Sequence, residues 1–73
     1  MREALIEARG VRTQTDVSAE IGISQKYLSK LELTQRTPSL KIAIKIATYY
    51  QRSVESLFLD IFLSKNSPNS SMQ

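Results

Sequence analysis

Residues 14–33 read QTDVSAEIGISQKYLSKLEL and contain a single glycine, Gly22, near the middle. On each side of that glycine, apolar residues recur three or four positions apart, which is the spacing of one helix face: Val17, Ile21, Leu28 and Leu31. Glycine adopts the left-handed backbone conformation that commonly ends a helix. The stretch therefore predicts two short helices, residues 14–20 and 25–33, joined by a sharp turn.

The residues around these two helices agree with that prediction. Thr13 and Ser24 precede the helices, where a hydroxyl can cap the free backbone N–H groups. Helices that cross steeply must approach closely, and Ser18 supplies a small side chain at the expected contact. Two helices with a glycine-containing turn form the layout of a helix-turn-helix unit.

The second helix has a polar face opposite its apolar stripe. Its members share one exposed surface at helical spacing: Gln25, Lys26, Ser29, Lys30 and Leu33. Glutamine can pair bidentately with adenine, and lysine can donate to guanine O6 and N7. Ser24 and Gln25 lie at the N-terminal end, which reaches furthest into a DNA groove in such units. This face predicts base recognition in the major groove.

The rest of the chain predicts three more helices and no strand. Residues 2–9 end at Gly10, residues 40–50 follow Pro38-Ser39, and residues 54–63 follow the cap residue Ser53. In the fourth helix the apolar residues at helical spacing are Leu40, Ala43, Ile44, Ala47 and Tyr50. Residues 64–73 are rich in serine and asparagine, and we expect a flexible polar tail. The prediction is one all-α domain of five helices, residues 1–63, followed by that tail.

Composition limits the possible chemistry. The 73 residues contain no cysteine and no histidine, which removes thiol catalysis, thiolate metal sites and the commonest general base. We therefore expect no enzyme activity, no cofactor and no metal site. Residues 24–52 carry six basic side chains against one acid, Glu32, for a net charge of +5, whereas residues 1–23 and 53–73 are each −1. A basic middle segment suggests a polyanionic partner, although a solvated lysine-rich face fits the charge equally well.

At this point the sequence resembles a known family, the Xre/Cro-like repressors, whose domain is lambda-repressor-like. The resemblance covers about residues 13–58, and its motifs are Thr13-Gln14, Val17-Ser18, Ile21-Gly22-Ile23-Ser24, Tyr27-Leu28-Ser29-Lys30-Leu31-Glu32, Arg36-Thr37-Pro38-Ser39-Leu40, Ile46-Ala47 and Ser53-Val54-Glu55-Ser56-Leu57-Phe58. The resemblance implies a compact five-helix domain that binds palindromic operators in double-stranded DNA, usually as a dimer.

The resemblance also implies a role for individual residues. Gln14 would contact the DNA backbone, where the helix dipole favours an anion. Gln25, Lys26 and Lys30 would recognise bases. Tyr27 would touch phosphate or a thymine methyl group, with the edge of the core as the alternative, and Arg36 would approach phosphate or the minor groove. Glu32 would be structural, with Arg9 the best candidate for its partner.

The chain departs from the family pattern at two helix ends and before Thr13. The connector after Glu32 reads Leu33-Thr34, where the family has a small polar residue followed by glycine, and threonine tolerates positive φ poorly. Gln51-Arg52 replaces a glycine–apolar pair, so we expect Arg52 to be exposed. Gly10-Val11-Arg12 precedes Thr13, where the family has glycine and one apolar residue.

The last predicted helix is apolar on most sides, so more than one of its faces must be covered. We expect a two-fold dimer through this region, with Leu59, Phe62 and Leu63 in the interface and Ile42, Ile46 or Tyr49 beside it. A larger intramolecular core is the alternative. A symmetric dimer would place the two recognition helices about 34 Å apart, one turn of DNA.

The sequence thus predicts a DNA-binding transcriptional regulator, with a repressor favoured over an activator. The alternatives are an antitoxin-like module that binds a protein partner on the same fold, nonspecific nucleic-acid binding and, least favoured, a small enzyme. Neither a signal peptide nor a membrane span is visible in the sequence, and we expect a cytoplasmic, nucleoid-associated protein of bacterial or phage origin.

Overall fold

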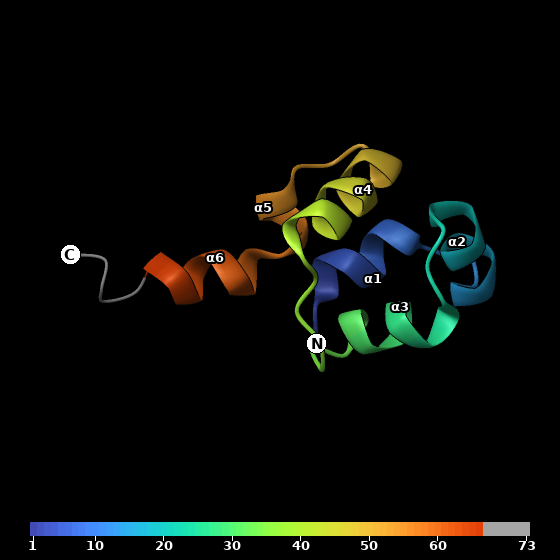
Figure 1. The fold of residues 1–73 in the computed structure, drawn as a ribbon, viewed down its shortest axis with the longest axis horizontal. Coiled ribbons are helices and arrows are strands. Elements are labelled where there is room, and N and C mark those ends of the chain that lie inside the picture. Colours follow the sequence, from blue (N-terminus) through green and yellow to red (C-terminus); the bar gives the residue numbers. More distant parts are fainter. Residues whose placement is uncertain (67–73) are drawn as a thin grey trace.

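Six helices make up the part of the chain that the computed structural model describes, which is the backbone of residues 1–66 and the side chains of residues 1–62. In chain order they are α1 (Glu3–Arg9), α2 (Gln14–Ile21), α3 (Gln25–Glu32), α4 (Leu40–Tyr50), α5 (Val54–Leu57) and α6 (Leu59–Asn66), as Figure 1 shows. Residues 1–66 include no strand. None of these helices is long and apolar enough to cross a membrane. The expected all-α class is confirmed.

Four of the helices begin at a hydroxyl cap. The side-chain oxygens of Thr13, Ser24, Ser39 and Ser53 accept hydrogen bonds from the backbone N–H groups of Asp16, Tyr27, Ile42 and Ser56, at 3.0, 3.0, 3.3 and 3.1 Å. Each such cap typically stabilises its helix by about 1 kcal/mol. These local signals explain why the predicted helix starts are confirmed.

Besides Gly10 after α1 (φ 64°), three helices end at a residue with positive φ: Gly22 (96°), Thr34 (65°) and Gln51 (59°). In each of these three cases the backbone N–H of the next residue donates a hydrogen bond to the carbonyl five positions earlier. The bonds run from Ile23 to Ser18 (3.0 Å), from Gln35 to Lys30 (2.8 Å) and from Arg52 to Ala47 (3.0 Å). Only the first of the three positions holds a glycine. Thr34 and Gln51 therefore adopt this conformation at a cost in backbone free energy.

The core is assembled from α1 to α5 and the residue that follows α5. Its most buried side chains are Leu5, Val17, Ile21, Leu28, Leu31, Ala43, Ile46, Ala47, Leu57 and Phe58. The predicted stripe of α2 and α3 is confirmed here, with Ile23 partly buried against it. The core thus braces the two helices of the helix-turn-helix unit from one side.

The inner face of α4 is rotated from the one that the sequence predicted. Leu40 and Ile44 are 71% and 49% exposed, whereas Ile46 is fully buried. The side chains that face inward are Ala43, Ile46, Ala47 and Tyr50, which also obey helical spacing. Two overlapping stripes satisfy the same periodicity, and the packing of α4 against α2 and α5 selects one of them.

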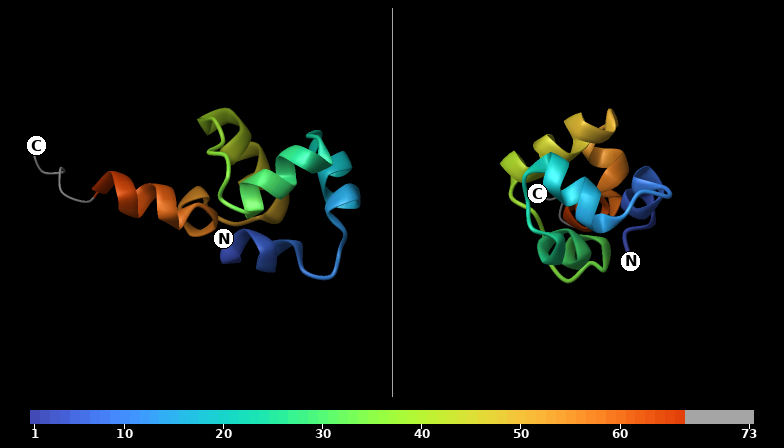
Figure 2. Two further views of the ribbon diagram at one scale, coloured as in Figure 1. Left: turned by 90° about the horizontal axis from the view of Figure 1, so that it is seen from below. Right: turned by 90° about the vertical axis from the view of Figure 1, so that its right-hand side faces the viewer.

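The predicted last helix, residues 54–63, is two helices. Phe58 leaves helical geometry at φ −122° and ψ 43°, and α6 starts after it. The break allows Leu57 and Phe58 to enter the core while α6 extends away from the other helices (Figure 2). The domain therefore has six helices instead of five. Residues 64–66, assigned to the tail, belong to α6; residues 67–73 lie outside the described part.

Candidate nucleic-acid interface

The crossing of α2 and α3 has the geometry that the sequence predicted. Gly22 turns the chain at φ 96°, and Ser18 is 3% exposed at the contact. A Cβ at Gly22 would lie 3.1 Å from Lys45 Nζ, the mobile end of a long side chain, so the positive φ is the stronger reason for a glycine here. In Figure 1, α3 lies along one edge of the molecule with α2 at its end. The outer side of α3 is left uncovered.

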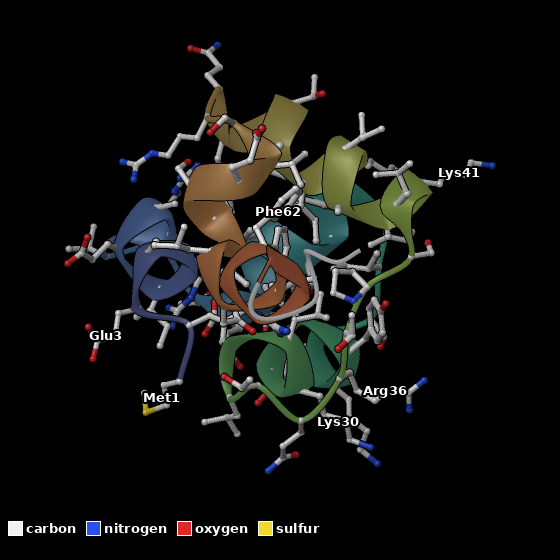
Figure 3. All side chains as sticks on the ribbon, turned by 90° about the vertical axis from the view of Figure 1, so that its left-hand side faces the viewer. Met1, Glu3, Lys30, Arg36, Lys41 and Phe62 are labelled. Atoms are coloured by element: carbon white, nitrogen blue, oxygen red, sulfur yellow. The ribbon has the colours of Figure 1, made fainter. Side chains whose placement is uncertain are left out.

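The polar face of α3 points away from the core. Gln25 and Lys26 are exposed, and Ser29 and Lys30 are half-buried. Figure 3 shows Lys30 and Arg36 extending in the same general direction, away from the domain. A helix with one buried and one open polar side matches the requirement for insertion into a groove.

The two ends of α3 hold the other predicted contact residues. The Ser24 hydroxyl accepts from the Tyr27 N–H at 3.0 Å, so it caps the helix and keeps its own hydrogen free to donate. The Tyr27 ring is half-buried against the core, and the Arg36 guanidinium lies 5.9 Å from its centroid. Tyr27 therefore borders both the core and the exposed Arg36.

A chain of hydrogen bonds connects the buried interior to the start of α3. Glu32 is 2% exposed, and its carboxylate accepts from Arg9 Nε and Nη2 at 2.8 and 3.1 Å. The hydrogen bond to Glu32 raises the pKa of Arg9 above its ordinary value. The carboxylate also accepts from Gln14 Nε2 at 2.7 Å. The expected partner of Glu32, Arg9, is confirmed.

This chain sets the direction of two amides. A carboxylate only accepts, so the Gln14 nitrogen must face Glu32 and the Gln14 oxygen must face outward. That oxygen accepts from Gln25 Nε2 at 2.6 Å. The Gln25 amide is left with its oxygen and one N–H, the acceptor and donor that an adenine edge requires. Gln14, expected at the DNA backbone, thus has two partners within the protein.

The exposed charge of the basic segment is entirely positive. Its single acid, Glu32, is buried and paired, while Lys26, Arg36, Lys41, Lys45 and Arg52 are exposed. Within the described residues, no three acidic side chains come together as a metal site would need. In Figure 3, Lys41 points away from Lys30 and Arg36, so the positive charges do not form one patch. Of the basic side chains in this segment, Lys26 and Lys30 lie on α3 and Arg36 lies in the connector that follows it.

Comparison with known proteins agrees with this geometry. The model of the Helix-turn-helix family HTH_3 matches residues 4–57, most of the chain. The chain belongs to this family. It is 34% identical over 47 residues to an uncharacterized HTH-type transcriptional regulator of Methanocaldococcus jannaschii, a match that covers 64% of this chain and 71% of that protein. No solved structure matches significantly. The resemblance to Xre/Cro-like proteins is thereby confirmed.

At two positions where the family has glycine, this helix-turn-helix protein has another residue in the same left-handed backbone conformation. Thr34 occupies the position after Leu33 where the family has glycine, and it takes the left-handed conformation at φ 65°. Gln51 does the same at the end of α4, and Arg52 is exposed as expected. The connector that carries Arg36 therefore keeps a glycine-like turn without a glycine.

One buried charged residue escaped the sequence analysis. Arg2 is 4% exposed, and its Nε donates to Asp60 Oδ1 at 3.0 Å. Its guanidinium lies 5.4 Å from the centroid of the Phe58 ring. An arginine just before the first helix is ordinarily solvated, and no local pattern connects it to a residue 58 positions away. Only the folded chain brings α6 to the N-terminus.

Proposed function

We propose that this helix-turn-helix protein is a sequence-specific transcriptional regulator that inserts α3 into the major groove of duplex DNA. The observation that carries the proposal is the fixed orientation of the Gln25 side-chain amide, which donates to the Gln14 oxygen. Its direction is set by Gln14 and, behind it, by buried Glu32, while Lys26 and Lys30 stand beside it on an open face. A pre-oriented amide discriminates between bases better than a freely rotating one, because a wrong edge leaves its polar atoms unpaired.

The proposed contacts divide into two kinds. Gln25, Lys26 and Lys30 recognise base edges and supply specificity. The remaining contacts position the domain on the sugar-phosphate backbone and supply much of the salt-dependent affinity: Gln14, Ser24, Tyr27, Ser29 and Arg36. The side chain of Gln14 acts in this scheme through one remaining amide hydrogen, since its other amide hydrogen is donated to Glu32 and its oxygen accepts from Gln25.

We further propose that the regulator is a homodimer on a palindromic operator and acts as a repressor. Leu59 is 52% exposed at the start of α6, and Phe62 borders an apolar groove of about 270 Å³ between α4 and α6. The side chain of Leu63, the third expected interface residue, lies outside the described part. Ile46, once expected beside the interface, belongs to the core. A repressor of this kind would act in the cytoplasm, at the DNA.

Selection of bound duplexes from a random pool tests this proposal most directly. We expect a palindromic consensus whose half-sites lie about one DNA turn apart, which reports base recognition and two-fold symmetry together. Sedimentation at high micromolar concentration tests the dimer independently of DNA. A pool that converges on no sequence would contradict sequence-specific recognition, and a monomer at that concentration would contradict the dimer.

A second candidate function rests on the same groove. An antitoxin-like module would use the apolar surface between α4 and α6, lined by Pro38, Leu40, Phe58 and Ile61 among others, to hold a protein partner. Co-purification of a stoichiometric partner from the native host would favour this function. Sequence-specific DNA binding by the isolated protein would show that the partner is not required for recognition.

A further inference from the structure

Arg2 ties three separate segments together through one guanidinium. Its Nη1 donates to the carbonyl of Leu31, at the end of α3, and to the carbonyl of Arg36, in the connector, both at 2.7 Å. Its Nε donates to Asp60 of α6 at 3.0 Å, and its own backbone N–H donates to the Glu32 carbonyl at 2.8 Å. The side chain is 2% exposed, so these bonds form out of contact with water.

The connector between α3 and α4, residues 33–39, has few hydrogen bonds of its own that would fix its backbone. It has no regular secondary structure beyond the turn that closes α3, and it passes through Thr34 at an unfavourable φ of 65°. The Arg36 side chain is exposed, with its guanidinium 5.9 Å from the Tyr27 ring centroid, while the bond from Arg2 holds the Arg36 carbonyl and so restrains the backbone from which that side chain extends. A charged donor between two carbonyls is also stronger than a neutral one.

We propose that Arg2 is a positioning residue for DNA binding: it fixes the backbone of the connector and so sets the direction of the Arg36 side chain. The inference rests on the proposed function only in that it takes Arg36 to contact phosphate. Arg2 itself does not reach DNA, because its side chain is buried under α6 and the connector. The Asp60 carboxylate, which is 45% exposed, neutralises the Arg2 charge from the solvent side.

The contact geometry permits a clean double-mutant cycle. Arg2 binds the main chain of residue 36, so Arg36→Ala removes the proposed DNA contact without removing the bond from Arg2. The variants are Arg2→Met, which keeps an unbranched apolar stem but has no guanidinium and no donor, Arg36→Ala, and the double variant. Binding is measured against a mixed-sequence duplex, since a phosphate contact does not depend on the base sequence.

We expect Arg2→Met and Arg36→Ala each to weaken binding roughly five- to tenfold and each to lower the slope of log K against log salt by about one. The double variant should bind no more weakly than Arg36→Ala alone. Equal further weakening by Arg2→Met in the Arg36→Ala background would overturn the proposal, since Arg2 would then act on stability alone. Absence of duplex binding by the unaltered protein would instead refute the proposed function.

Two further variants cover the effect of Arg2 on folding. Ala8→Gly destabilises α1, the helix that follows Arg2, through backbone entropy without touching the connector, and we expect unchanged DNA affinity while the protein stays folded. If Arg2→Met does not fold, Arg2→Lys replaces it in the cycle, because an ammonium keeps the charge but cannot bridge both carbonyls and Asp60 as the planar guanidinium does. A loss of affinity with Arg2→Lys that persists in full without the Arg36 side chain would overturn the proposal in the same way.

Discussion

Arg9 and Glu32 form a bidentate ion pair, with N–O distances of 2.8 and 3.1 Å, although 23 positions separate them in the chain. The two partners are buried unequally, since the side chains of Arg9 and Glu32 are 19% and 2% exposed. Gln14 adds a third hydrogen bond to the same carboxylate. The pair thus fastens α1 to the end of α3 and gives Gln14 its direction.

We expect Arg9→Met to lower the free energy of unfolding by about 3 kcal/mol, because it leaves the Glu32 carboxylate buried without its cation. That loss is a large share of the stability of a domain this small, which is roughly 0.1 kcal/mol per residue. Urea denaturation followed by circular dichroism measures it. The double variant Arg9→Met/Glu32→Met should recover much of the loss. A change below about 1 kcal/mol in the single variant would show that the pair is solvated.

Thr34→Gly should stabilise the protein by about 1 kcal/mol, since glycine removes the clash of a β-branched side chain at φ 65°. For a domain of this size, the melting temperature should rise by roughly 4–8 °C. Thr37→Gly is the matched control: Thr37 lies in the same connector at negative φ, so the same change should destabilise by adding freedom to the unfolded chain. Equal effects at both positions would contradict strain at Thr34.

Burial raises the pKa of Tyr50 to about 12. The pKa of Tyr50 is thus higher in the folded protein than in the unfolded chain, where it is about 10. The contribution of this shift to the free energy of unfolding is present in full below pH 10 and is lost as the pH rises toward 12. The hydroxyl is buried with no hydrogen-bond partner among the described residues. Tyr50→Phe should therefore stabilise the protein by about 1 kcal/mol at pH 7 and reduce its alkaline loss of stability.

Denaturation between pH 8 and pH 12 tests the Tyr50 prediction, with Tyr49→Phe as the control. A hydrogen bond to Glu20 raises the pKa of Tyr49, so a second alkaline component should remain in Tyr50→Phe. Tyr49→Phe removes the contacts with Glu20 and Arg12 and should not stabilise the protein at pH 7. Tyr50→Phe with lower stability at pH 7 would mean that the hydroxyl has a partner in solution.

Lys30→Ala should weaken binding to a selected operator by about 1–3 kcal/mol and relax the choice of base at one position. Competition between the selected duplex and variants changed at single base pairs measures both effects. Lys41→Ala is the matched control, since Lys41 points away from Lys30 in Figure 3 and should affect binding only weakly. An equal loss on random DNA would assign Lys30 to phosphate instead of to a base.

Local chemistry explains which features were predictable. The caps at Thr13, Ser24 and Ser53 and the turn at Gly22 each depend on a few neighbouring residues, so the starts of the helices and the bend between α2 and α3 followed from sequence. The polar face of α3 was predictable because it is the side of the helix opposite the buried apolar residues. The structure differed from the prediction on α4, where two apolar stripes fit helical spacing equally well. It also differed at residues 54–63, where the predicted helix breaks so that Phe58 can reach the core.

The sequence by itself determined the helix-turn-helix unit and the kind of side chain that it presents, because periodicity and capping act within a few residues. Tertiary structure alone decided how those side chains are held. The bonds from Glu32 through Gln14 to Gln25, and from Arg2 to Arg36 and Asp60, join positions between 11 and 58 residues apart. Such pairs carry no local signal, since they come within hydrogen-bonding distance only when α2 packs on α3 and when the N-terminus packs on the connector and α6.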